Sequence, residues 1–451
     1  MDALIVVFVT GLISMFIAMA KKPALVLATA VTGLSVAIGL MVCQWSHPYT
    51  LVKYEGLLFD HNAIKYSVLA MSFALLVIVG GYSHFRKEAE HTGEYISLLL
   101  FSTVGALCMT AFTDMFMFFL GLEILSIPIY VMAGSKKRDI LSTEASLKYF
   151  FTGSFATGVL LFGMAWVYGA TGSFKLAEIQ AAISLGTAQG ALLNVGILMM
   201  MASFLFKVGA APFHFWSPDV YGGAPNIVTG FMAAVVKLAG LFAFWKLFTI
   251  AFADANAVWG GALAGIIILT VLVGNLSALR QTKFKRLLAY SSIANAGYAL
   301  LAIINQDTQS QQNLFIYLVG YGFAIIALIV VSLVLDNESD DIEAYKGIGR
   351  KNPFIGFVLV LATLSIAGVP PLAGFFGKYM VFSSAFAMYP ILVIIAIITS
   401  GIGIYYYLRF IMTALSSEDT ENVQTLKPSI LHYIVLAVCV VGLLAGGYIS
   451  L

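Results

Sequence analysis

The architecture of this chain is set by its long apolar stretches, and the most informative of them covers residues 191–216, which read ALLNVGILMMMASFLFKVGAAPFHFW. About 20 predominantly apolar residues are enough for a helix to cross the hydrocarbon core of a bilayer, so this stretch is long enough to span one. Gly209 and Pro212 fall inside it, and a proline has no backbone N–H to donate to the preceding turn. We therefore expect a membrane-spanning helix that is interrupted near Pro212.

The rest of the chain has a similar composition. Of its 451 residues, 61% are hydrophobic and 10% are charged, and the mean hydropathy is +0.96. A typical soluble domain has about 25% charged residues. The net charge of +2 indicates no surface for nucleic acid, and the three cysteines lie singly in apolar runs without a CxxC motif, so no metal site is expected. This composition excludes a soluble enzyme, a disordered chain and a fibrous protein, and it predicts an all-α integral membrane protein.

Apolar runs separated by polar residues predict fourteen membrane-spanning helices. The predicted spans are residues 2–20, 25–45, 62–84, 95–112, 114–134, 144–169, 191–216, 226–250, 256–279, 285–304, 311–335, 353–386, 390–414 and 428–449. The twelfth is too long for one straight helix and contains Pro370 and Pro371, so it should be broken like the seventh. The first basic residues, Lys21 and Lys22, follow the first apolar run, which is typical of a retained helix and not of a signal peptide.

The basic residues between the spans predict the orientation of the chain. Those in odd-numbered loops are Lys21, Lys22, Arg86, Lys87, Lys136, Lys137, Arg138, Arg280, Lys283, Lys285, Arg286, Lys346, Arg350, Lys351 and Lys427. Even-numbered loops contain only Lys53 and Lys175. Because cytoplasmic loops are rich in lysine and arginine, the odd loops should lie in the cytoplasm and both termini on the outer face.

The remaining basic residues fall within predicted spans, where an ionisable group costs about 2.5–3.5 kcal/mol at mid-bilayer. Lys65, Lys246 and Arg409 lie near span ends, from which their long stems can carry the charge to the interface. Lys237 lies twelve residues into its span, which is too deep for this. We therefore predict that Lys237 faces a protein interior or a hydrated cavity and has a functional role.

Two further charged groups are expected to work with Lys207. His214 follows Lys207 by seven residues, two turns along the same helical face, with the break at Pro212 between them, and this combination suggests a hydrated proton path. Glu123 is the carboxylate nearest the middle of a span, and its expected partner is Lys207, with Lys148 as the second choice. Pairing favours the charged forms of both groups and desolvation favours the neutral forms, so such a pair could exchange protons. The alternative is a static structural ion pair.

Lys148 and Lys378 complete the set of candidates. Lys148 lies four residues after Glu144 near the start of its span, so an ordinary helical pair explains it as well as a functional role does. Lys378 follows the Pro370–Pro371 break by seven residues, and a lysine beside unwound backbone is typical of a polar cavity. Nucleotide-binding and haem-attachment motifs do not occur. The residues alone therefore predict movement of protons or cations, without electron chemistry in this chain.

Two long motifs resemble a known family. Residues 204–225 read FLFKVGAAPFHFWSPDVYGGAP and residues 285–298 read KRLLAYSSIANAGY. Both resemble the signature of the proton-translocating antiporter-like subunits of respiratory complex I. The resemblance implies a polytopic bundle of about 14 transmembrane helices with two inverted five-helix repeats, in which helices 7 and 12 are interrupted. It divides the chain into three N-terminal helices (1–94), a first repeat of helices 4–8 (95–250), a second repeat of helices 9–13 (256–415) and a C-terminal helix (428–451).

The resemblance also implies the site and the partners. The family's proton-translocating residues correspond to Glu123, Lys148, Lys207, His214, Lys237 and Lys378. Such a subunit carries no cofactor of its own, because FMN, the iron–sulfur clusters, NADH and quinone are bound by other subunits. Its expected partners are the antiporter-like subunit M, the small subunits K and J, and the lipid of a bacterial inner membrane. The alternatives are a subunit of a multi-subunit cation/proton antiporter or membrane-bound hydrogenase, and a solute carrier that binds its substrate at the broken helices.

Overall fold

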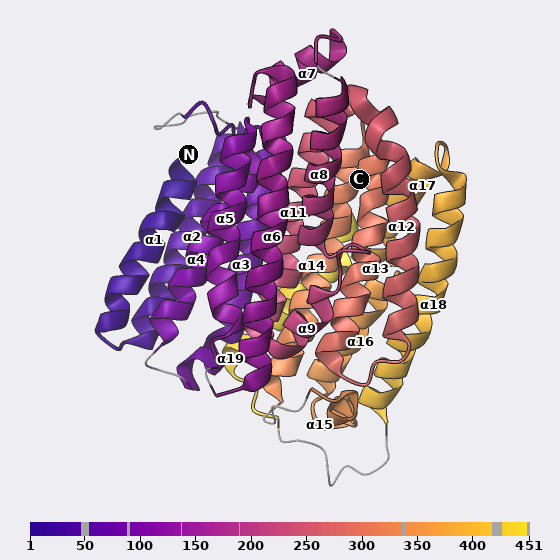
Figure 1. Cartoon of the computed structure of the whole chain (residues 1–451). Helices are drawn as coiled ribbons and strands as arrows, with labels where there is room; N and C mark the ends of the chain where they lie inside the picture. The colour runs from indigo at the N-terminus through magenta and orange to yellow at the C-terminus, as the bar shows by residue number, and fades with distance from the viewer. Residues whose placement is uncertain are drawn as a thin grey trace. The chain divides into compact units, whose positions relative to one another are not determined.

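The computed structural model describes residues 1–46, 54–87, 91–136, 138–188, 190–335, 340–416 and 426–448. Lys53 and Lys137, which the sequence places in loops, lie outside the described residues. The described chain is almost entirely helical (Figure 1). Its first helices are α1 (Asp2–Met19), α2 (Pro23–Ser46), α3 (His61–Lys87), α4 (Thr92–Ala111), α5 (Met115–Ala133), α6 (Ile140–Thr171), α7 (Leu176–Ser184), α8 (Gly190–Val208), α9 (Trp216–Gly223) and α10 (Asn226–Phe231). They are followed by α11 (Lys237–Lys246), α12 (Asn256–Ala278), α13 (Phe284–Ile304), α14 (Ser310–Val334), α15 (Ile348–Lys351), α16 (Pro353–Ala367), α17 (Ala373–Phe386), α18 (Pro390–Leu415) and α19 (Ile430–Ala445).

The predicted spans correspond to helices of the structure. Within the described residues, 13 helices are long and apolar enough to cross a membrane, and they match every predicted span but the twelfth. In the twelfth, α16 ends at Ala367 and α17 begins at Ala373, so neither half reaches the length of a span alone. The predicted all-α polytopic fold with a broken twelfth span is therefore confirmed.

Both predicted interruptions are present and have the same local form. In the seventh span α8 ends at Val208, and Gly209 follows with a φ of +74°. In the twelfth, α16 ends at Ala367, and Gly368 follows with a φ of +89°. This left-handed region is open to glycine at little cost, which is why a glycine stands at the C-terminal end of each first half-helix.

The chain divides into two compact units. Unit 1 comprises Met1–Ser135, Ser146–Lys207 and Val235–Ala262, and unit 2 comprises Lys136–Ala145, Val208–Ala234 and Leu263–Leu451. In unit 1, α4 packs against α1, α2, α3, α5 and α11 and is buried along most of its length. In unit 2, α14 packs against α10, α13, α16, α17 and α19. The repeat boundaries predicted from the family resemblance stay a prediction.

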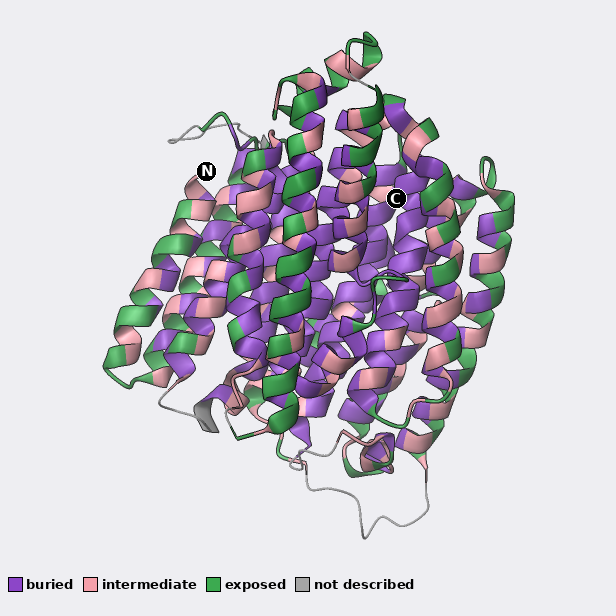
Figure 2. Cartoon of the chain, viewed as in Figure 1, coloured by how far each residue is buried: buried purple, intermediate pink, exposed green. Residues whose placement is uncertain are grey.

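Burial separates the interior helices of each unit from those suited to lipid (Figure 2). In unit 2, α13 and α14 are buried over 94% and 89% of their apolar windows, whereas the corresponding share of α18 is 39%. Large apolar side chains of α18, such as Ile391 and Met412, are exposed. Lipid tails are as apolar as these side chains, so this face of the helix can be exposed to the bilayer.

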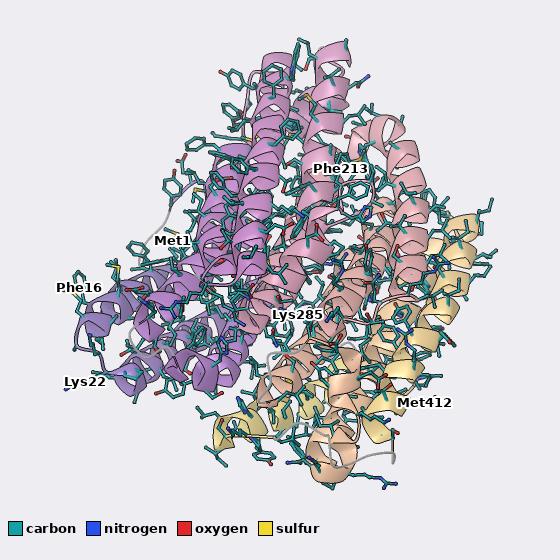
Figure 3. All side chains as sticks on the ribbon, turned by 60° about the horizontal axis from the view of Figure 1, so that its bottom comes forward. Met1, Phe16, Lys22, Phe213, Lys285 and Met412 are labelled. Atoms are coloured by element: carbon teal, nitrogen blue, oxygen red, sulfur yellow. The ribbon has the colours of Figure 1, made fainter. Side chains whose placement is uncertain are left out.

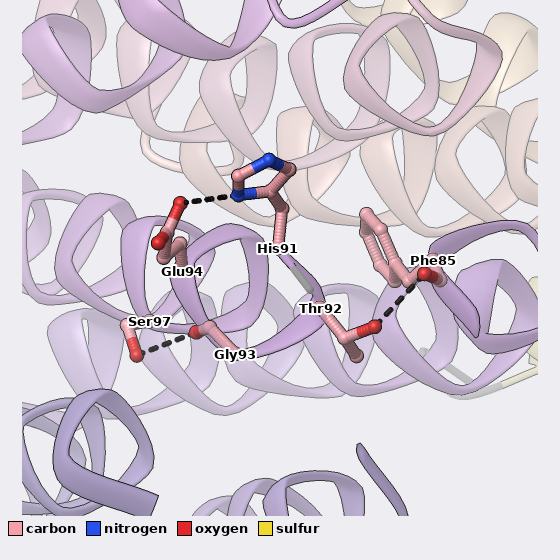
Figure 4. Close-up of polar contacts among 6 residues, drawn as sticks. All are labelled: Phe85, His91, Thr92, Gly93, Glu94 and Ser97. Atoms are coloured by element: carbon pink, nitrogen blue, oxygen red, sulfur yellow. Dashed lines mark hydrogen bonds and ion pairs between the residues drawn. The ribbon is translucent and has the colours of Figure 1, made fainter. Parts of the chain in front are cut away.

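Polar side chains form hydrogen bonds around the start of α4 in unit 1 (Figure 4). Thr92 Oγ1 donates to the carbonyl oxygen of Phe85 at 2.8 Å, and Ser97 Oγ donates to that of Gly93 at 2.8 Å. His91 Nδ1 lies 3.0 Å from Glu94 Oε2 at the exposed start of α4. The hydroxyl of Thr92 thus ties the first residue of α4 to the end of α3.

Two local features are absent from the sequence prediction. The short helix α7 lies between the sixth and seventh spans. The eighth span contains a π-helical segment over Met232–Val236, immediately before Lys237, and another over Leu247–Ala251. Single π-helical turns occur often at functional sites, so the first of them marks the surroundings of Lys237.

We expect the substitution Gly374→Ala to destabilise unit 2. A Cβ atom at this position would collide with the backbone oxygen of Ser365, so α17 and α16 would have to separate. Overpacking of this kind costs about 1–3 kcal/mol, which should lower the midpoint temperature of thermal unfolding of the purified protein. Gly401→Ala on α18 is the matched control, because a Cβ atom there meets nothing within 4 Å. Equal midpoints for the two variants would contradict the close packing of α16 on α17.

Candidate functional site

Lys207 lies in a polar site between α5, α6 and α8 of unit 1. Its side chain is 6% exposed, and its Nζ atom donates to Ser126 Oγ at 2.6 Å. Ser126 Oγ in turn donates to the carbonyl oxygen of Leu122. The ammonium group lies 5.8 Å from the centroid of the Tyr149 ring, within the range of a cation–π contact. The basic residue falls in the last turn of α8, where the helix dipole favours a positive charge.

Glu123 belongs to the same site but does not form an ion pair with Lys207. Its Oε1 atom accepts a hydrogen bond from Thr157 Oγ1 at 2.8 Å, and its charge acts on Lys207 electrostatically. Glu123, Ser126 and Tyr130 are spaced by three and four residues, so they share one face of α5. The predicted association of Glu123 with Lys207 therefore takes the form of a small polar cluster in which Ser126 accepts the hydrogen bond of the lysine.

Lys148 and Lys237 are both in unit 1 but have different surroundings. Because α6 begins at Ile140, Lys148 lies eight residues after the start of the helix, and the predicted pair with Glu144, four residues before it on the same helix, stays a prediction. Lys148 is half-buried. Lys237 is 6% exposed and is the first residue of α11, directly after the π-helical segment. The prediction that Lys237 faces a protein interior agrees with this burial.

Lys378 lies at the break of the twelfth span in unit 2. Its side chain is 7% exposed, and its Nζ atom donates to the carbonyl oxygen of Ala367 at 3.1 Å and to Ser400 Oγ at 3.0 Å. It also lies 5.0 Å from the centroid of the Tyr298 ring. Ala367 is the last residue of α16, so the ammonium group satisfies one of the carbonyl groups that a helix end leaves without a partner.

His214 lies in unit 2, in the turn between the break and α9. It is 7% exposed, and its carbonyl oxygen accepts a hydrogen bond from Ser217 N at 2.9 Å. The preceding residue in the sequence, Phe213, is labelled in Figure 3. Because α8 ends at Val208, the helical spacing that placed His214 on one face with Lys207 does not apply, and that part of the sequence argument is wrong.

Lys246 differs from its predicted role at a span end. It is 6% exposed, and its Nζ atom donates to the carbonyl oxygen of Thr110 at 3.2 Å and lies 5.0 Å from the centroid of the Phe112 ring. The charge is therefore held inside unit 1 and does not reach outward. Arg409 fits its expected place better, because its guanidinium donates to the carbonyl oxygens of Leu279 and Gln281 just beyond the end of α12.

A polar pocket of about 360 Å³ opens in unit 2 beyond Lys378. Its lining residues are Asp307, Gln309, Gln312, Asn313, Ile316, Met380, Ser383 and Ser384. The last three follow Lys378 on α17, and the backbone of α14 at Ile316 and Tyr317 approaches the neighbouring Gly377 closely. Asn305 precedes the lining residue Asp307 by two positions. Its side-chain nitrogen is buried and has no hydrogen-bond partner among the described residues. A buried polar group of this kind typically binds water.

The described residues hold no group of three or more His, Cys, Asp or Glu side chains that could bind a metal ion. What the site offers instead is a set of buried amines, one carboxylate, an imidazole and several hydroxyl groups. Such groups can accept, hold and release protons within a membrane.

Comparisons with known proteins identify relatives of the chain. A family model described as "NADH:quinone oxidoreductase/Mrp antiporter, TM" matches residues 112–403. The chain is 39% identical over 429 residues to NADH-quinone oxidoreductase subunit N of Cytophaga hutchinsonii, and the match covers 94% of this chain and 92% of the relative.

Solved structures agree with the family match. A chain of respiratory complex I from Thermus thermophilus, solved with bound aureothin, has a TM-score of 0.85 and 31% identity, and the match covers 100% of this chain and 98% of that one. A chain of an archaeal membrane-bound sulfane sulfur reductase also has a TM-score of 0.85, with 23% identity and coverage of 100% and 95%. The second likeness concerns the fold alone.

Proposed function

The chain belongs to the NADH:quinone oxidoreductase/Mrp antiporter membrane family, and from this premise we propose that it is a membrane-arm subunit of NADH:quinone oxidoreductase that translocates protons through its own buried charged residues. It is of the same type as the relatives named subunit N. NADH oxidation and quinone reduction take place in other subunits in this proposal, and the chain itself carries out no redox step.

The burial of three lysines within membrane-spanning segments is the observation that carries the proposal. Lys207, Lys237 and Lys378 are 6%, 6% and 7% exposed. An ionisable group in this setting is costly, and where it is kept it usually marks an ion or proton pathway. For Lys207 and Lys378 the hydrogen-bond partners are hydroxyl and carbonyl oxygens, so neither lysine is neutralised by a bonded carboxylate. Each can therefore lose its proton without leaving an unpaired negative charge bonded to it.

The proposed route follows the order of these residues that the family resemblance implies. A change of charge in a neighbouring subunit alters the electrostatic interaction between Glu123 and Lys207. Lys148 of α6 is a further charged member of the pathway in this proposal. Lys207 then releases its proton, which passes by way of His214, Lys237 and bound water to Lys378. Desolvation favours the neutral form of a buried amine, so small changes in nearby charge are enough to move a proton.

The pocket beyond Lys378 is the proposed outlet. Its open polar lining, which includes Asp307, can hold water that takes up a released proton. By the distribution of basic residues, the outlet faces the same side as both termini, which we place on the outer face of a bacterial inner membrane.

The partners in this proposal are the other membrane subunits. The neighbouring antiporter-like subunit M and the small subunits K and J would transmit the energy of quinone reduction, and the FMN, iron–sulfur clusters and quinone belong to subunits other than this chain. A cation/proton antiporter or membrane-bound hydrogenase would use the same buried charges. The high identity to a quinone oxidoreductase subunit over nearly the full length of both chains favours the first assignment.

The assembly in which the chain works is tested by its migration on a native gel. Membranes that contain the tagged chain are solubilised gently, separated, stained for NADH dehydrogenase activity and probed for the tag. We expect the tag to co-migrate with a large NADH-oxidising band. A band that contains the chain without NADH oxidation, together with sodium- or potassium-dependent proton movement in vesicles, would replace the proposal by an antiporter.

A further inference from the structure

The short helix that follows the break of the seventh span, α9, is held at its C-terminal end by α13. Lys285 Nζ donates to the carbonyl oxygen of Ala224 at 2.9 Å, and Ala224 is the residue that ends α9 (Figure 3 labels Lys285). A helix end leaves its last carbonyl groups without partners, and a cation there is favoured by the helix dipole. Lys285 is 8% exposed, so this hydrogen bond is shielded from water.

The neighbouring basic residue makes a weaker contact with the start of the same helix. Arg286 Nη1 lies 3.4 Å from Asp219 Oδ1, and the two side chains are 42% and 36% exposed. An exposed ion pair of this kind contributes little because water and salt screen it. Of these two basic residues, the buried Lys285 therefore makes the stronger contact between α13 and α9.

Lys285 is itself placed by Asp340, which caps the start of α13 from a distant part of the chain. The N-terminal cap residue of α13, Lys283, offers no side-chain cap. Instead, the Asp340 carbonyl oxygen accepts from Phe284 N at 2.6 Å, and Asp340 Oδ1 accepts from Lys285 N at 3.0 Å. The backbone oxygen and the carboxylate of Asp340 thus each accept one of the N–H groups that the start of a helix leaves free. The negative charge also interacts favourably with the helix dipole.

The charge of Asp340 responds to pH in the physiological range. Burial raises the pKa of Asp340 from its usual value to about 6, and the positive charges of Lys285 and Lys283 oppose this rise. Asp341 and Tyr345 are the other titratable groups that interact with it among the described residues. Asp340 is thus mostly ionised above pH 6 and mostly protonated below it. When Asp340 is protonated, the buried ammonium of Lys285 loses its favourable electrostatic interaction with this carboxylate.

We propose that Asp340 is a positioning residue of the proton pathway: through Lys285 it fixes the C-terminal end of α9, and its protonation loosens α9 and the turn that carries His214. This inference rests on the proposed function for its consequence, since His214 is part of the pathway there. The link Asp340–Lys285–Ala224 lies wholly within unit 2.

Hydrogen–deuterium exchange of α9 in the intact complex tests the link directly. Asp340→Asn keeps an acceptor for Lys285 N but removes the charge, and Lys285→Met removes the hydrogen bond to Ala224. In both variants we expect the amides of α9 to exchange about tenfold faster at pH 7.5, because a charge-assisted hydrogen bond has been weakened or lost. Lys285→Arg keeps the charge and should exchange like the wild type.

The matched control is Asp341→Asn. Asp341 Oδ1 lies 2.8 Å from Lys283 Nζ in an ion pair whose side chains are 47% and 49% exposed, so its loss should leave α9 unchanged. The pH profile separates positioning from mere packing. After correction for the intrinsic pH dependence of exchange with a reference peptide, α9 of the wild type should loosen below pH 6, whereas α9 of Asp340→Asn should not change with pH.

Wild-type exchange of α9 in Asp340→Asn, or an equal rise in Asp341→Asn, would overturn the inference. If Asp340→Asn fails to assemble on a native gel, the comparison of Lys285→Met with Lys285→Arg decides in the same way. Proton pumping of the same preparations reports separately on the proposed function. A loosened α9 with unchanged pumping would support the link and contradict the role given to His214.

Discussion

Replacing Lys237 by methionine is expected to reduce NADH-driven proton pumping by at least about tenfold, because a positioned proton donor or acceptor typically contributes more than that to a proton-transfer step. Quinone reductase activity should fall with it, since the two processes are coupled. The complex should still assemble, because methionine has a similar volume and replacing a buried charge by an apolar group is often neutral or stabilising. Pumping is measured in vesicles by quenching of a pH-sensitive dye, and assembly by native gel.

Lys246→Met on the same helix is the control for this experiment. Lys246 is as buried as Lys237 and donates to the carbonyl oxygen of Thr110, but it has no place in the proposed route. We expect this variant to pump at close to the wild-type rate. Full coupled activity in Lys237→Met would remove the central residue from the proposed pathway and with it the proposal in its present form.

The second large effect is expected for Lys378→Met, which removes the last amine before the pocket. Proton pumping should again fall by at least about tenfold, for the same reason as at Lys237. Ser400→Ala provides the comparison, because it deletes one hydrogen-bond partner of Lys378 while the carbonyl oxygen of Ala367 and the ring of Tyr298 remain. That variant should keep most of its activity. If Ser400→Ala lost as much pumping as Lys378→Met, the serine hydroxyl would be the essential group at this break.

The spans and their interruptions could be predicted from the sequence because they depend on local properties. Hydropathy over residues 191–216 and 353–386 gave two long spans, and a proline in each predicted the break that the structure places after Val208 and Ala367. The π-helical segments beside Lys237 and the short helix α7 were not predictable in this way, because their residues fit an ordinary helix or a loop equally well.

The burial of the candidate lysines was predictable from the sequence, and their contacts were less so. Burial of Lys207, Lys237 and Lys378 follows from their depth in the spans, which the sequence shows. The partners of these residues come from distant segments, and one sequence contains no record of such pairs. Glu123 accepts a hydrogen bond from Thr157 instead of pairing with Lys207. Lys246 donates a hydrogen bond to a backbone carbonyl oxygen of α4. The cap that Asp340 provides for α13 belongs to the same class of contact.

The hydroxyl group that receives Lys207 has a further consequence. A serine oxygen carries one hydrogen and two lone pairs, so Ser126 can accept from an ammonium group or, after rotation about its C–O bond, donate to a neutral amine. A site that can hydrogen-bond both the charged and the neutral lysine does not by itself impose a direction on proton transfer. By microscopic reversibility, a sufficiently large proton gradient of the opposite sense should drive the same sequence of steps backwards. The direction of proton movement along the proposed pathway is then set by the free energies applied to it and not by the residues that form it.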